Sequence, residues 1–90
     1  MYATYDRLLS FSSVHHMLRA EKILAAAGIT FADMPTPREV DVSCGQCLLF
    51  HASDEEKVLT LLAEGQIIWS KLFDRNGPAK KYEKLAEWGG

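Results

Sequence analysis

The 90-residue sequence is poor in cysteine and has no long apolar run. Its two cysteines are too few for a disulfide-rich secreted scaffold. The N-terminal segment has no long apolar stretch after a basic start, so we expect no secretion signal. No apolar stretch approaches the roughly 20 residues that cross a bilayer. We therefore expect a cytoplasmic protein without membrane contact, in which thiols are normally reduced.

The sequence also lacks an excess of charge and the common phosphate-binding motifs. Ten basic and twelve acidic residues give a formal net charge of −2. This balance argues against a nucleic-acid binder, because phosphate binding needs clustered Lys and Arg. Neither G-x-x-x-x-G-K-[ST] nor G-x-G-x-x-G occurs. The single C-x-x-C supplies half of a structural zinc site, and no second ligand pair follows. We expect no nucleic-acid partner, no cofactor and no metal in the isolated monomer.

What is present suits one small packed domain. The hydrophobic content of 48% is enough for a core without staples. The apolar periodicity predicts the order strand, helix, strand, strand, helix, strand. The predicted strands are Tyr5–Phe11, Ile29–Met34, Cys47–His51 and Gln66–Phe73, and the predicted helices are Val14–Ala27, ended by Gly28, and Ser53–Gly65. After Pro78, the spacing of Tyr82, Leu85, Ala86 and Trp88 predicts a short C-terminal helix.

This order of elements predicts an α+β fold, namely a ferredoxin-like βαββαβ sandwich. Such a fold has an antiparallel four-stranded sheet in the spatial order 4-1-3-2, with two helices on one face. We expect residues 1–74 to form this carrier-type domain and residues 75–90 to form a turn and the short helix. That helix either covers the open sheet face or docks on a partner.

The predicted topology gathers several polar segments at one end of the sheet. The end of the first strand, the start of the first helix and the link between strands two and three all lie there. Ser12, Ser13, His16 and the segment Pro35–Cys47 should therefore share this end. His51 should lie at the opposite end.

Cys44-Gly45-Gln46-Cys47 is the strongest chemical signal. Two thiols at this spacing can form a disulfide, share a soft metal ion, or act as nucleophile and resolving thiol. Gly45 permits a sharp turn and the approach of a bulky reactant. In the predicted fold the pair faces the N-terminus of the first helix, whose dipole favours a thiolate. Alternatively the cysteines are small buried hydrophobic residues, which weighs more for Cys47 at a strand than for Cys44 on a polar loop.

Other polar residues are candidates to support the thiol loop. Ser12 and Ser13 are natural N-caps of the first helix. His16 lies at the edge of the apolar stripe, where an imidazole can polarise a thiol. Glu21 lies inside that stripe and is either partly exposed or paired, and Arg38 is one candidate partner. Arg38 can instead bind an anion.

Four short runs resemble a small bacterial family, the putative selenium/sulfur carrier-like proteins. They are Phe11-Ser12-Ser13-Val14-His15-His16, Ala20-Glu21-Lys22, Pro35-Thr36-Pro37-Arg38-Glu39 and Ser43-Cys44-Gly45. The resemblance extends from the first strand to the fourth. It implies a carrier that holds sulfur or selenium on Cys44 as a persulfide or selenide, with donor and acceptor proteins as partners. In our carrier hypothesis Cys47 is the candidate resolving thiol, and the candidate supporting residues are Ser12, Ser13, His16, Glu21, Pro37, Arg38 and Gly45.

Three functional hypotheses remain at this point. The first is the thiol carrier, which acts with partner enzymes rather than as an enzyme on its own. The second is a soft-metal-binding module, in which two thiols bind a Cu(I)-like ion or share a site across a homodimer. The third is a non-catalytic interaction or regulatory domain whose cysteines are structural. The sequence leaves the oligomeric state open.

Overall fold

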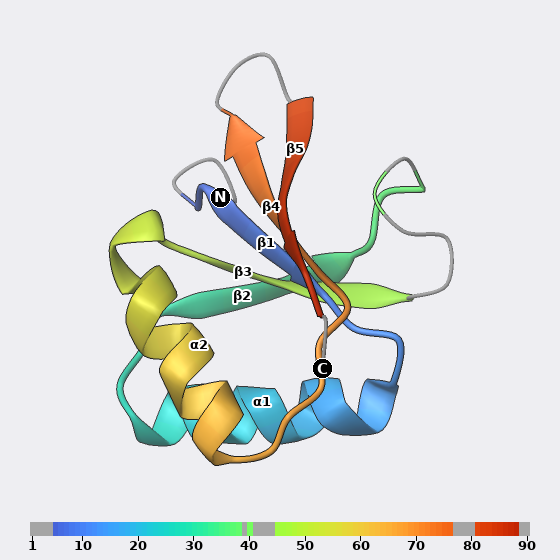
Figure 1. Ribbon diagram of the computed structural model, residues 1–90. Coiled ribbons are helices and arrows are strands. Elements are labelled where there is room, and N and C mark those ends of the chain that lie inside the picture. Colours follow the sequence, from blue (N-terminus) through green and yellow to red (C-terminus); the bar gives the residue numbers. More distant parts are fainter. Residues whose placement is uncertain (1–4, 39, 41–44, 77–80, 89–90) are drawn as a thin grey trace.

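The computed structural model describes residues 5–38, 40, 45–76 and 81–88 (Figure 1). Five antiparallel strands form one sheet in the order β2-β3-β1-β4-β5. The strands are β1 (Arg7–Ser10), β2 (Phe31–Pro35), β3 (Gln46–Phe50), β4 (Lys71–Asn76) and β5 (Lys81–Glu87), and the helices are α1 (Val14–Ala26) and α2 (Glu55–Glu64). The predicted α+β class is confirmed. Neither helix is long and apolar enough to cross a membrane.

The first four strands take the spatial order that the ferredoxin-like prediction requires. The predicted C-terminal helix is wrong, because Lys81–Glu87 form β5 and pair with β4. A register shift at Leu72/Phe73 lets Tyr82 pack with one side of the sheet and Ala86 with the other. Pairing supplies the exposed edge of β4 with backbone partners, so tertiary context overrides the helical spacing. β4 also runs across residue 74, the predicted boundary between the carrier-type domain and the C-terminal turn, and the position of that boundary stays a prediction.

Both helices pack against one face of the sheet (Figure 1). The apolar stripe of α1 meets that of α2 and the strand residues that point to this face. The buried members of this core, which we call the helix-side core, are Leu9, Phe11, Met17, Ala20, Leu24, Ile29, Leu48, Phe50, Val58, Leu62, Ile67 and Leu72. Burial of these side chains is the main favourable contribution to the free energy of folding for a domain of this size.

The opposite face of the sheet has an apolar cluster of its own. It consists of Leu8, Val40, Cys47, Leu49 and Phe73, with Tyr5, Met34 and Tyr82 packed beside it. We call these five buried residues the second core. Adjacent residues of one strand point to opposite faces, so Leu48 belongs to the helix-side core and Leu49 to the second core. Both sides of β3 are therefore buried.

The fourth strand begins later than predicted, at Lys71 rather than Gln66. Gln66 has a positive φ of 57°, and the Ile67 amide donates to the Leu62 carbonyl, which closes the end of α2. Ile67 is fully buried in the helix-side core. Residues 66–70 thus form a connection that reaches the sheet where the Ser70 amide donates to the Ser10 carbonyl.

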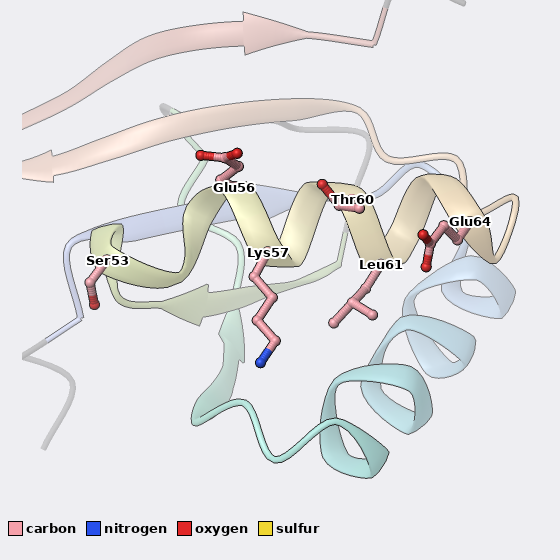
Figure 2. Close-up of a pocket in the computed structure, with 6 residues that line it drawn as sticks. All are labelled: Ser53, Glu56, Lys57, Thr60, Leu61 and Glu64. Atoms are coloured by element: carbon pink, nitrogen blue, oxygen red, sulfur yellow. The ribbon is translucent and has the colours of Figure 1, made fainter.

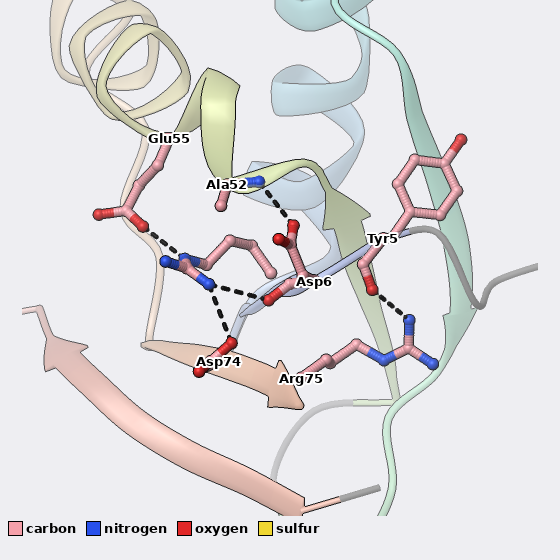
Figure 3. A network of polar contacts seen from close by, with 7 residues as sticks. Tyr5, Asp6, Ala52, Glu55, Asp74 and Arg75 are labelled. Atoms are coloured by element: carbon pink, nitrogen blue, oxygen red, sulfur yellow. Dashed lines mark hydrogen bonds and ion pairs between the residues drawn. The ribbon is translucent and has the colours of Figure 1, made fainter. Parts of the chain in front are cut away.

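A polar network joins the other end of the sheet to the start of α2 (Figure 3). Arg7 Nε lies 2.6 Å from Glu55 Oε1, and Arg7 Nη1 lies 2.9 Å from Asp74 Oδ1. The Ala52 amide donates to Asp6 Oδ1 at 2.6 Å. Stacking of His51 on Tyr5 places His51 at this end, as predicted, with ring centroids 4.7 Å apart. The network fixes α2 to β1 and β4, at the end of the sheet opposite to Gly45–Cys47.

Candidate functional site

The predicted gathering of segments at one sheet end is confirmed for the described residues. Ser10 is opposite Cys47 in the β1–β3 pair, and Met34 is opposite Cys47 in the β2–β3 pair. Val14, the first residue of α1, follows shortly after Ser10. The end of β1, the start of α1 and the connection from β2 to β3 therefore meet here. Cys44 lies outside the described residues.

The described part of the β2–β3 connection projects from the sheet end, away from both helices (Figure 1). At its base, the Thr36 amide donates to the Gly45 carbonyl at 3.2 Å. The Val40 amide donates to the Pro37 carbonyl at 3.0 Å, the hydrogen bond of a turn. Arg38 is exposed, whereas Val40 is only 7% exposed and belongs to the second core. The connection is thus anchored by an apolar side chain.

Gly45 is exposed and faces open space. A Cβ at this position meets no heavy atom within 4 Å, and the φ of Gly45 is outside the left-handed region. Gly45 is therefore not required by a positive φ or by close packing. The open space at Gly45 leaves room for an approaching reactant, which is one of the two properties inferred from the sequence.

Cys47 is fully buried in the second core. Its Sγ lies 3.7 Å from the Met34 carbonyl oxygen, as a weak hydrogen-bond donor. The expectation that both thiols face the N-terminus of α1 is wrong for Cys47. Its register in β3 directs the side chain to the sheet face without helices. The Cys47 thiol is therefore not in direct contact with the N-terminus of α1.

The N-terminus of α1 is capped as predicted. Ser13 has extended backbone geometry, and its Oγ accepts a hydrogen bond from the His16 amide at 3.5 Å. Ser12 is exposed. The His16 ring Nδ1 accepts a hydrogen bond from the Ile68 amide at 3.1 Å. This bond ties α1 to the connection between α2 and β4, so the structure gives His16 a partner other than a thiol.

His16→Ala should lower the free energy of unfolding by about 1 kcal/mol, because the Ile68 amide loses its acceptor. The matched control is the exposed neighbour His15→Ala, which should change stability by less than about 0.5 kcal/mol. Urea unfolding measures both variants. If the thiols of a fully folded His16→Ala protein react more slowly than those of the parent, the polarising role that the sequence predicts for His16 is supported instead.

Glu21 has a different partner from the predicted one. Its carboxyl faces that of Asp33 on β2 rather than Arg38. A hydrogen bond with Asp33, together with partial burial and the Asp33 charge, raises the pKa of Glu21 from 4.5 to about 7. Glu21 therefore keeps its proton up to near-neutral pH, because the hydrogen bond to Asp33, partial burial and the nearby Asp33 charge all disfavour ionised Glu21. The pair joins α1 to the edge strand β2.

The proton that Glu21 keeps in the folded protein makes the free energy of unfolding depend on pH. The folded protein keeps a proton on Glu21 that the unfolded chain releases, so the free energy of unfolding falls as the pH rises from 4.5 to about 7. Glu21→Gln removes this loss. We expect the variant to be more stable than the parent by about 1 kcal/mol at pH 8, since solvent screens part of the effect, and equal to it near pH 4. Urea unfolding at both pH values tests this, with exposed Glu64→Gln as control. If Glu21→Gln is more stable than the parent by the same amount at both pH values, the raised pKa of Glu21 is contradicted.

A shallow depression of about 520 Å³ runs along α2 (Figure 2). Its lining comes from this helix and the turn before it: Ser53, Glu56, Lys57, Thr60, Leu61 and Glu64. None of the predicted site residues lines it. Within the described residues, no group of three or more His, Cys, Asp or Glu side chains is arranged to hold a metal ion. The depression and the thiol segment are separate features.

Sequence reasoning missed Val40 and Asp33 as neighbours of the site. Val40 carries a visible signal, since it is one of two valines, with Val42, within a polar segment. Asp33 carries none, because an acidic residue on an edge strand is ordinary. Only the packing of α1 over β2 brings it to Glu21.

A family model described as putative Se/S carrier protein-like matches residues 6–74. The chain belongs to this family. The match to the Se/S carrier-like family covers the first four strands to within β4, both helices and the entire thiol segment, and it confirms the resemblance carried by the four short runs. β5 lies beyond the matched residues. No curated protein and no solved structure matches the chain.

Proposed function

We propose that this protein is a small thiol carrier that holds sulfur or selenium on Cys44 and passes it to a partner enzyme. The observation that carries the proposal is the family match over residues 6–74, which includes the complete C-x-x-C segment. The open space at Gly45 supports it, because a carrier thiol has to enter a partner's site. We place this activity in the cytoplasm, where thiols stay reduced.

The transfer chemistry needs only thiolate exchange. The Cys44 thiolate attacks the terminal sulfur of a persulfide on the donor enzyme. A new S–S bond forms at Cys44, the donor's S–S bond breaks, and the donor leaves as a thiolate with the electron pair. The acceptor enzyme then takes the terminal sulfur by the same exchange. A selenium cargo is held on the same atom.

Intact mass spectrometry tests the proposal directly. The reduced protein is incubated with a cysteine desulfurase and cysteine, and we expect a gain of one sulfur atom that a small thiol reductant reverses. An unmodified mass, under conditions in which the same desulfurase loads a known acceptor, would contradict the carrier function.

The soft-metal alternative is less favoured by the geometry of Cys47. A shared metal needs both sulfurs as thiolates directed at one point. The Cys47 thiol instead donates to a carbonyl inside an apolar cluster. The interaction-domain alternative has one supporting observation, the complete burial of Cys47, which is the property of a structural cysteine. If Cys44 does not react in the native protein, the interaction-domain alternative is correct.

A further inference from the structure

We propose that Val40 is a positioning residue that covers Cys47 and keeps this thiol from reacting with a cargo held on Cys44. The inference rests on the proposed carrier function for its purpose, but its structural part stands on Val40 and Cys47 alone. In this role, Val40 keeps the resolving thiol of Cys47 apart from the cargo on Cys44.

The first observation is the composition of the second core. Leu8, Cys47, Leu49 and Phe73 all belong to strands of the sheet. Val40 is the one buried member that comes from outside the strands. Strand side chains on one face lie beside each other, whereas a covering group has to come from another segment. On a face without helices, Val40 supplies that cover within the described residues.

The second observation concerns where other cover is available. Tyr5, which also packs against the second core from outside the strands, stacks on His51. His51 follows the last residue of β3, four positions along the chain from Cys47. At about 3.3 Å per strand residue, this places Tyr5 toward the far end of the cluster. Val40, from the connection that leaves the sheet at the Cys47 end, is the nearer cover.

The third observation is how Val40 is held. The Thr36–Gly45 hydrogen bond closes the base of the connection, and the Val40 amide donates to the Pro37 carbonyl. These bonds direct the Val40 side chain into the cluster. The same segment leads through Gly45 into β3, where Cys47 is the second residue. Displacement of Val40 from the second core would therefore uncover the end of the cluster at which Cys47 lies.

The chemical consequence follows from the persulfide reaction. A Cys47 thiolate that attacks the Cys44 sulfur of a persulfide forms a Cys44–Cys47 disulfide and breaks the S–SH bond. Hydrosulfide leaves with the electron pair and takes up the proton that Cys47 lost. This reaction discards the cargo. While Cys47 stays buried, with its Sγ beside the Met34 carbonyl oxygen, the thiol cannot reach the persulfide and the reaction cannot start.

The first test measures the access of a reagent to Cys47 alone. In a Cys44→Ser background, Val40→Ala is compared with Val58→Ala, the same truncation of a fully buried valine in the helix-side core. The readout is the rate of iodoacetamide alkylation at pH 7 by intact mass, at several low urea concentrations. Val40→Ala should alkylate at least tenfold faster than the background, with little dependence on urea, because only a local opening is needed. Val58→Ala should react faster only through global unfolding, with the full urea dependence.

Val40→Thr is a second variant that keeps the volume and should shift the rate in the same direction by less. If Val40→Ala and Val58→Ala accelerate alkylation equally, in proportion to their loss of stability and with the same urea dependence, Val40 is not a specific cover and the proposal is wrong.

A second measurement links the cover to the cargo. Proteins with both cysteines are loaded with the desulfurase, separated from it, and assayed for sulfide release and for the disulfide mass. Val40→Ala should lose its sulfur several-fold faster than the parent, and Val58→Ala at the parent rate. Failure to load any variant would overturn the carrier function but not the alkylation result, so the two failures are distinguishable. Equal release from a loaded Val40→Ala protein and the parent would overturn the protective role.

Discussion

Replacing Cys44 with serine is expected to abolish sulfur loading completely, whereas Cys47→Ser should still load. The prediction follows from the proposed carrier role of Cys44 and from the burial of Cys47. A thiol at 0% exposure cannot enter a donor's site. A serine hydroxyl is far too weak a nucleophile toward a persulfide to replace Cys44. Intact mass after desulfurase treatment measures both variants.

The controls separate chemistry from folding. Cys47→Ser places a hydroxyl where the thiol donates to the Met34 carbonyl, so the new group keeps an acceptor and we expect a cost of about 1 kcal/mol. Circular dichroism should show native structure for both variants. If Cys44→Ser loads as well as the parent, the carrier assignment to Cys44 is wrong. If only Cys47→Ser fails to load while folded, the roles of the two cysteines are reversed.

The largest stability effects are expected at two adjacent positions of β3. Leu48 and Leu49 are both fully buried, on opposite faces of the sheet. Leu48→Ala and Leu49→Ala should each lower the free energy of unfolding by about 2–5 kcal/mol, since each leaves a cavity in a packed cluster. For a domain of this size that corresponds to a fall in Tm of about 10 °C or more.

A sheet covered on one face only would behave differently. There Leu49→Ala would be nearly neutral, like the exposed control Lys57→Ala on α2, for which we expect a change within about 0.5 kcal/mol. Thermal and urea unfolding of the three variants measure the difference. A neutral Leu49→Ala would show that the second core is open to water, and the shielding of Cys47 by Val40 would lose its basis.

Much of the fold could be predicted because local signals and packing agree. Ser13 caps α1 as its position indicates, and Gly28 follows the helix with a φ of 76°, a conformation that glycine adopts at little cost. The apolar periodicity gave the order of the first four strands and both helices. The family was recognisable from short runs near the sheet end, and the family model confirms it.

The C-terminal segment shows where local pattern is insufficient. Tyr82, Leu85 and Ala86 have a spacing that suits a helix, yet they lie in β5. A bulged strand next to β4 accommodates the same spacing, and it uses backbone groups of β4 that no local rule accounts for. The contact of Trp88 with Trp69, with ring centroids 5.8 Å apart, holds the end of this strand in place.

By itself, then, the sequence determined the order of the first four strands and both helices, the end of the sheet at which the β2–β3 connection lies, and the family, because caps, periodicity and short motifs are properties of neighbouring residues. Only the tertiary structure decided which face Cys47 occupies, what covers it, and which residue Glu21 meets. The side-chain period of a strand is two, so its register against β1 and β2 sets the direction of Cys47. That register depends on contacts between segments far apart in the chain, and no local pattern contains them.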